Sequence, residues 1–162
     1  MATKIYVSPE TALEWTDSGG DYVIDLGGIA ADGVRVGARG DLGAAAHSDT
    51  YAWRFVLDGF DTAPVVGETV DIYVSTSDGT NEDGDVGTAD AAGVTVSLPN
   101  LMFLGSAVVQ TTTAGDNLQV SGIVSLPNRY VSPVIHNNTV DALLSSGDAH
   151  KFFLTPMPME SQ

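Results

Sequence analysis

The chain has 162 residues, a length that suits one domain with a sizeable buried core. Its 21 acidic residues outnumber its 6 basic ones, which gives a formal net charge of −15 at pH 7. Because binding to nucleic-acid phosphates and to anionic membranes depends on clustered Lys and Arg, we expect no nucleic-acid or membrane partner. The chain has no cysteine, which excludes disulfides and thiolate metal sites.

Residues 1–20 carry apolar groups without a clear strand pattern, and they predict an N-terminal arm. We interpret Trp15, which lies in this arm, as an exposed aromatic that contacts a partner. No basic stretch precedes an apolar core near Met1, so we expect no signal peptide and production in a cytoplasm.

The domain proper is predicted over residues 21–155, beginning with short strands at 22–26 and 33–42. The strongest signals follow at 50–58 and 69–77, where apolar and polar residues alternate. A period of two means that each strand buries one face and exposes the other. We therefore predict a core rather than a sugar-binding aromatic platform from the residues of one parity, which are Tyr51, Trp53, Phe55, Leu57, Val70, Ile72 and Val74.

The second half continues the same pattern of short strands separated by Gly, Asp and Pro turns. Further strands are predicted at 94–98, 101–112, 118–126, 130–137 and 151–155, with one helical turn at 139–145. Short strands at this spacing favour an all-β fold, an antiparallel β-sandwich. A jelly roll is our first choice among such sandwiches, although the strand order stays open.

Residues 77–93 form the most polar stretch, and we predict a long exposed loop there. Asp78, Asp83 and Asp85 are weak candidates for a calcium site, since this ion takes several carboxylate oxygens. The spacing does not fit an EF-hand, because the twelfth position counted from Asp78 is Ala89 rather than Glu. A solvated loop without metal is the favoured interpretation, and we expect no cofactor.

No catalytic motif is present among the polar residues. His47, His136 and His150 lack the spacing of a metal-binding helix, and no Gly-x-Ser-x-Gly sequence occurs. We therefore expect a protein that is not an enzyme.

Residues 156–162 predict an extended tail, because proline at 156 and 158 prevents helix formation. Arms of this kind commonly lie on a neighbouring subunit, so the apolar residues of both termini are candidate partner contacts. They are Ile5, Tyr6, Val7, Trp15, Met157 and Met159.

In these features the chain resembles the small, acidic, cysteine-free β-sandwich proteins that decorate the heads of tailed bacteriophages, called decoration or cement proteins. The stretches that carry the resemblance are 51–53, 67–73 running into 77–79, Asn100-Leu101, Leu104-Gly105, 129–135 and the short tail ending at Gln162.

The resemblance implies a structural virion protein on the capsid exterior that stabilises the particle by bridging subunits of the phage major capsid protein. It also implies a homo-oligomer, with a homo-trimer as the expected form. Two alternatives stay open: a carbohydrate-binding or lectin-like jelly-roll module, with or without calcium dependence, and a domain of a phage tail or fibre.

Overall fold

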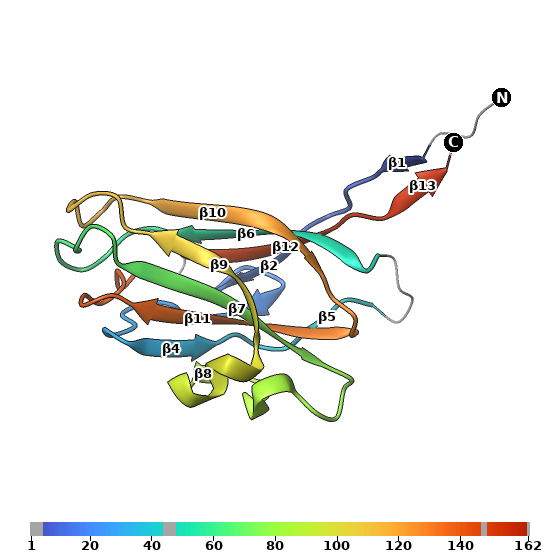
Figure 1. Ribbon diagram of the computed structural model, residues 1–162, viewed down its shortest axis with the longest axis horizontal. Coiled ribbons are helices and arrows are strands. Elements are labelled where there is room, and N and C mark those ends of the chain that lie inside the picture. The colour runs from blue at the N-terminus through green and yellow to red at the C-terminus, as the bar shows by residue number, and fades with distance from the viewer. Residues whose placement is uncertain (1–4, 44–47, 147–148, 162) are drawn as a thin grey trace.

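The computed structural model describes residues 5–43, 48–146 and 149–161 and packs two β-sheets face to face (Figure 1). One sheet has five strands in the order β10-β6-β12-β2-β3, which are Leu118–Ser125, Thr50–Leu57, Lys151–Pro156, Leu13–Thr16 and Tyr22–Val23. The other has six strands. Five follow the order β8-β4-β11-β7-β9, which are Ala91–Ala92, Gly33–Val36, Tyr130–Asn138, Thr69–Ser77 and Met102–Val108, while β5 (Gly40–Asp41) also pairs with β11.

The strand pairing is nested along the chain, as in a folded ribbon. The outermost pair is β2 with β12, followed by β4 with β11, β6 with β10 and β7 with β9. All four pairs are antiparallel, and the nesting divides these strands equally between the two sheets. This is the jelly-roll arrangement, so the predicted fold class is confirmed. The parallel pair β2–β3 is the exception to the antiparallel rule.

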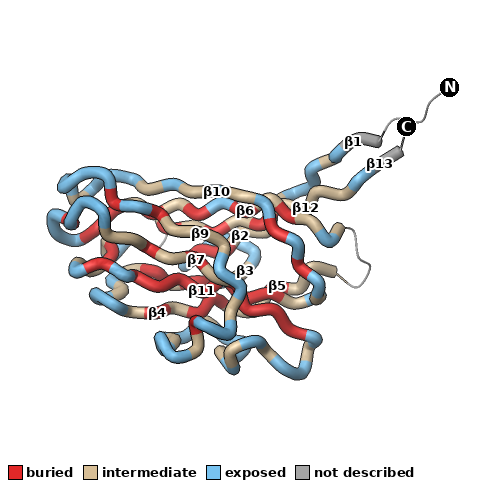
Figure 2. Tube along the Cα trace, in the orientation of Figure 1, coloured by how far each residue is buried: buried red, intermediate tan, exposed pale blue. Residues whose placement is uncertain are grey.

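The core lies between the sheets and consists of the side chains that alternation places inward (Figure 2). Strand β6 alternates strictly, with Tyr51, Trp53, Phe55 and Leu57 buried. In β7, Val70, Ile72 and Val74 are fully buried. The predicted core is therefore confirmed.

Our prediction that Trp15 is an exposed contact residue is wrong, because Trp15 is fully buried in β2. Its indole stacks on Tyr22 with ring centroids 4.9 Å apart, and its N–H donates to the carbonyl of Ala38 over 2.8 Å. The same strand shortens the predicted arm of residues 1–20, since Leu13–Thr16 belong to the five-stranded sheet. A large aromatic surface with a satisfied N–H is more stable inside the sandwich than in water.

The strand predicted at 33–42 is divided into β4 and β5, and those predicted at 22–26 and 101–112 are shorter, as β3 and β9. Two other expected elements are replaced by a different kind of structure. The strand predicted at 94–98 is replaced by a 3₁₀ helix, η2 (Thr95–Asn100), which contains Pro99. The helical turn predicted at 139–145 is an irregular loop instead, in which Leu143 is buried and forms a β-bridge with Phe60. Asn137 of β11 holds this loop by donating from its side-chain amide to the carbonyl of Asp141 over 2.7 Å.

Gly40 gives Trp15 its space, so we predict that Gly40→Ala destabilises the fold. A Cβ at this position would lie 2.3 Å from Cζ2 of Trp15, far inside van der Waals contact. Overpacking of this kind costs about 1–3 kcal/mol or more. Urea unfolding of the variant measures the loss. Gly115→Ala is the matched control, because nothing lies within 4 Å of its Cβ position. Equal stability of the two variants would contradict the packing argument.

Candidate interaction surfaces

The two terminal arms pair with each other in a ribbon that projects from the sandwich (Figure 1). Strand β1 (Ile5–Val7) runs antiparallel to β13 (Met159–Ser161), with Val7 opposite Met159. Backbone hydrogen bonds from Ser8 to Pro158 and from Glu10 to Pro156, each of 3.0 Å, continue the ladder towards the sheet. We call residues 5–10 and 156–161 the terminal ribbon.

The terminal ribbon presents apolar side chains to solvent. Val7 and Met159 are 52% and 77% exposed, and their cross-strand pairing places them on one face. Met157 is half-buried, and its N–H donates to the Thr50 carbonyl at the base of the ribbon. The backbones of Ile5 and Tyr6 belong to β1, while their side chains lie outside the described part of the structure. The structure therefore gathers five of the six predicted contact residues into the ribbon or its base and removes Trp15.

The acidic stretch is largely exposed, as its composition predicts, but it is attached to the sandwich. Residues 78–101, which we call the flap, fold back over the outer face of the six-stranded sheet. Leu98 of η2 joins Val34, Val36 and Val134 in a second small core on that face. The flap also contains a 3₁₀ turn, η1 (Asp83–Asp85), and strand β8, which pairs with β4.

Ion pairs attach the flap to the body. The guanidinium of Arg35 in β4 binds Asp90, with Nε 2.8 Å from Oδ1, and the half-buried pair raises the pKa of Arg35. Arg39 Nη1 lies 2.9 Å from Glu82 Oε1. A third pair, Arg129 with Asp41, lies beside the base of the flap, and both Arg39 and Arg129 lie over the ring of Tyr130. Two of the acidic residues of the flap, Asp90 and Glu82, therefore form ion pairs with basic residues of the sandwich.

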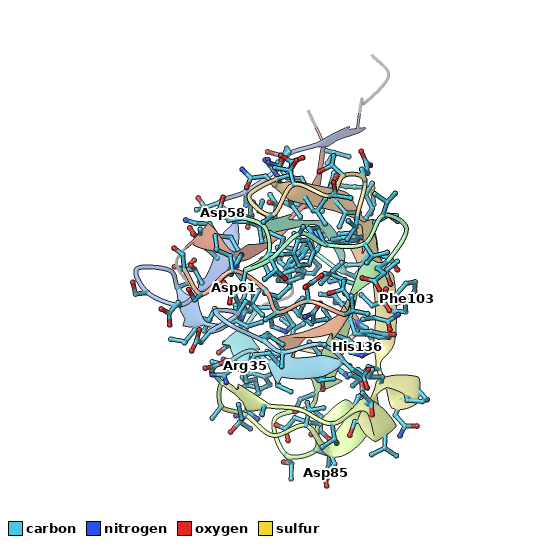
Figure 3. All side chains as sticks on the ribbon, turned by 90° about the vertical axis from the view of Figure 1, so that its left-hand side faces the viewer. Arg35, Asp58, Asp61, Asp85, Phe103 and His136 are labelled. Atoms are coloured by element: carbon cyan, nitrogen blue, oxygen red, sulfur yellow. The ribbon has the colours of Figure 1, made fainter. Side chains whose placement is uncertain are left out.

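Two of the three calcium candidates, Asp78 and Asp83, serve as local hydrogen-bond acceptors. Asp78 accepts from the backbone N–H groups of Asn81 and Thr80, which lowers its pKa. Asp83 accepts from the N–H and hydroxyl of Thr76. Asp85 lies at the outer end of the flap (Figure 3). Within the described ranges, no group of three His, Asp or Glu side chains is arranged to hold a metal ion, so the geometry gives the calcium hypothesis no support.

Leu98 anchors the flap, and we predict that Leu98→Asp releases it while the sandwich stays folded. Burying a leucine contributes about 2 kcal/mol, so its loss raises the open population of the flap roughly 30-fold. Limited proteolysis should cleave the variant faster within residues 78–101. Val96→Asp is the control, because Val96 lies on the same 3₁₀ helix and is 79% exposed. Equal cleavage rates in the two variants would show that Leu98 does not hold the flap.

The outer face of β10, β6 and β12 is a second exposed surface. The strand register aligns outward residues in rows, of which the central one is Ser121, Arg54 and Phe153 and the next is Ile123, Ala52 and Thr155. Arg54 and Ile123 are exposed, and the other members of these rows are exposed or half-buried. We call this surface the β10-β6-β12 face.

The end of the sandwich opposite the terminal ribbon is acidic (Figures 1 and 3). The four loops that connect β3 to β4, β6 to β7, β9 to β10 and β11 to β12 meet there. Backbone hydrogen bonds join them, such as those from Phe60 to Ala114 and from Leu143 to Ile29. The described parts of these loops contain no Lys or Arg, and their acidic residues are Asp25, Asp32, Asp58, Asp61, Glu68, Asp116 and Asp141. We call this region the acidic end.

His150 is fully buried beneath the acidic end. Its Nδ1 accepts from the N–H of Asp58 over 3.0 Å, and its Nε2 lies 2.8 Å from the carbonyl of Leu144. Because a backbone N–H can only donate and a carbonyl can only accept, the ring is neutral with its proton on Nε2. Burial lowers the pKa of His150, which favours this neutral form.

We predict that His150 makes the fold less stable as the pH falls below about 6.5, the ordinary histidine pKa. Its folded-state pKa is lowered. Between the two pKa values the unfolded chain binds more protons than the folded one, so acid favours unfolding by up to about 1.4 kcal/mol per pH unit. Urea unfolding at several values between pH 8 and 5.5 measures this slope. His150→Gln should flatten it, and equal slopes in both proteins would contradict the assignment.

A polar cluster on the outer face of the six-stranded sheet contains groups that also occur in hydrolases. His136 Nε2 lies 2.9 Å from Asp32, and its Nδ1 lies 3.9 Å from Asp71. Ser106, however, donates its hydroxyl to Asp71 over 2.6 Å rather than to the imidazole. A nucleophilic serine needs a base that takes its proton, and here the ring is not placed to do so. This geometry does not form a Ser-His-Asp triad.

Within the described ranges, no helix has the length and apolar character needed to cross a bilayer. The sheet topology and the pairing of β1 with β13 define the molecule as a jelly-roll protein with a paired terminal ribbon. No protein-family model matches the chain, and no curated protein matches it.

Two of the solved structures that match the chain have low similarity to it. The crystal structure of murine APRIL at pH 5.0 has 10% identity and a TM-score of 0.39, covering 75% of this chain and 72% of that one. The C-terminal domain of EclA, described as a sugar-binding protein, has 11% identity and a TM-score of 0.35, covering 93% and 77% respectively. At this level of similarity neither comparison bears on what the present chain binds.

Proposed function

We propose that this protein is a head decoration protein of a tailed bacteriophage, which binds the exterior of the capsid and bridges subunits of the major capsid protein. The observation that carries the proposal is the terminal ribbon, which projects from a rigid sandwich and exposes Val7 and Met159. It is supported by the resemblance of the sequence to such proteins.

The terminal ribbon has the properties of a docking element. The described sheet that contains it has only two strands, so β1 and β13 each have one unpaired edge. A two-stranded ribbon is marginally stable alone, and an open strand edge readily pairs with a strand of another chain. Addition of a strand at such an edge would give affinity through the backbone and specificity through the apolar side chains.

The proposed activity is mechanical. Packaged DNA presses the capsid outwards, and a protein that contacts two neighbouring subunits adds interactions that resist their separation. Single contacts can be modest, because several linked copies gain affinity through effective concentration. A homo-trimer at a local three-fold position would match the symmetry of such a site. The net charge of −15 would keep free copies away from cellular nucleic acids.

We predict that the double variant Val7→Asp with Met159→Asp folds normally but binds capsids at least ~10-fold more weakly. Both side chains lie outside the sandwich core, and desolvating two carboxylates in an apolar contact is costly. Binding is measured by co-sedimentation with capsids assembled from the major capsid protein encoded in the same genome. Thermal unfolding checks the fold.

Val140→Asp is the control, because Val140 is also an exposed valine but lies at the acidic end. It should bind like the unmodified protein. Failure of the unmodified protein to bind these capsids would refute the proposed function. Unchanged binding by the double variant would remove the terminal ribbon from the mechanism.

A carbohydrate-binding module is the second candidate, and one observation favours it. Phe103 is an exposed aromatic residue, and Tyr73 lies beside it with ring centroids 5.2 Å apart. Such a pair can contact the apolar face of a sugar ring. A glycan array with and without calcium distinguishes the two functions. Specific sugar binding that Phe103→Ala abolishes would favour the module over the decoration protein.

A further inference from the structure

The β10-β6-β12 face differs in charge from the rest of the molecule. The three strands contain no Asp or Glu, although the chain has 21 acidic residues. They contain two of its six basic residues, Arg54 and Lys151. Lys151 is paired, since its Nζ lies 2.6 Å from Oε1 of Glu14 on neighbouring β2. This face therefore carries positive charge on a strongly negative protein.

Among the described residues Arg54 has no carboxylate partner, which distinguishes it from the other basic side chains there. Arg35, Arg39, Arg129 and Lys151 each form an ion pair. Arg54 is exposed in the middle of the face, and its guanidinium donates to the side-chain carbonyl of Gln119. The guanidinium has five N–H donors in a fork that fits a carboxylate, so most of its capacity is unused.

The surroundings of Arg54 suit a protein contact. Ile123, one row away, is 69% exposed, and Ala52 and Phe153 add half-buried apolar surface. An apolar surface with an Arg at its centre has the composition typical of interface hot spots. No described element covers this side of the five-stranded sheet, whereas the flap covers the outer face of the other sheet.

We propose that the β10-β6-β12 face is the contact between copies of this chain, and that it receives an acidic surface of the next copy. Charge complementarity selects this occupant. Outside this face the chain has abundant carboxylates, and the acidic end has no basic residue in its described loops.

The same charges determine the type of symmetry. A two-fold axis through the middle of the face would place Arg54 against its own copy, and like charges in an interface are repulsive. A head-to-tail contact places the basic face of one copy on an acidic surface of the next, and such contacts form a closed ring when the rotation between copies closes. The inference deepens the proposed function, since it rests on the homo-oligomer which that proposal includes.

The test is the oligomeric state of the full chain, measured by sedimentation equilibrium at low and high salt. The unmodified protein should form a closed oligomer that weakens as salt rises, because the contact depends on charge. Arg54→Glu should raise the dissociation constant roughly 30-fold or more, since loss of a buried charge partner costs at least about 2 kcal/mol. Ile123→Asp should weaken assembly by a similar factor, because it places a carboxylate in an apolar contact that faces an acidic surface. Val96→Asp, an exposed valine on the flap, is the control and should assemble normally.

A photo-crosslinking side chain in place of Ser121 identifies the surface that the face contacts. The expected product joins position 121 to a segment of a second copy that contains Asp or Glu. A protein that stays monomeric at about 100 μM, or an oligomer that neither variant weakens, would overturn the inference. Capsid co-sedimentation is scored separately, so loss of assembly through Arg54 and loss of capsid binding through the terminal ribbon are distinguishable outcomes.

Discussion

The fold depends on the packing of β6 against β7 through their alternating faces. Trp53 and Phe55 of β6 lie in the same core as Ile72 and Val74 of β7, and this core joins the two sheets. Full burial of such side chains contributes about 1.5–3 kcal/mol each, more than any single exposed ion pair on the surface. Trp53 also fills the space left by two glycines, Gly105 of β9 and Gly122 of β10, whose Cβ positions would lie 3.2 and 2.8 Å from its ring. The sandwich therefore holds its shape without disulfides, and its surfaces remain free for other roles.

The charged residues are distributed unevenly over these surfaces. Arg35 and Arg39 bind Asp90 and Glu82 and so attach a flap whose composition alone would keep it in solvent. Arg129 binds Asp41, which lowers the pKa of that carboxyl to about 2, with the hydrogen bond from Arg129 as the largest cause. With most of its few cations bound internally, the molecule has an acidic end, an apolar terminal ribbon and one face without acids. The different surfaces are thus suited to different partners.

Local signals were sufficient for most strands of the sandwich. The predicted 69–77 strand matches β7, and those at 50–58, 118–126, 130–137 and 151–155 agree within one residue at each end, because alternation is visible within a single segment. The position of Trp15 was missed since β2 has only four residues, and its burial depends on Tyr22 and Phe152 from other parts of the chain. Leu98 was assigned to a strand because 94–98 alternates, whereas its contacts with Val34 and Val134 favour a 3₁₀ helix on the sheet. Candidate contacts at the termini could be selected from their apolar character, but their mutual pairing has no local signal.

The pairing of the termini follows from the topology itself. In a nested ribbon the first and last strands are partners, and here β2 lies beside β12 in antiparallel register. Residues that precede β2 and residues that follow β12 must therefore leave the sheet at the same place and in opposite chain directions, which is the geometry of an antiparallel ladder. The hydrogen bonds from Glu10 to Pro156 and from Ser8 to Pro158 continue that ladder into β1 and β13. Proline at 156 and 158 still accepts through its carbonyl, although it cannot donate, so one edge of the tail lacks backbone donors there. The jelly roll thus forms a single projecting ribbon from two arms, at the end of the molecule opposite the acidic end.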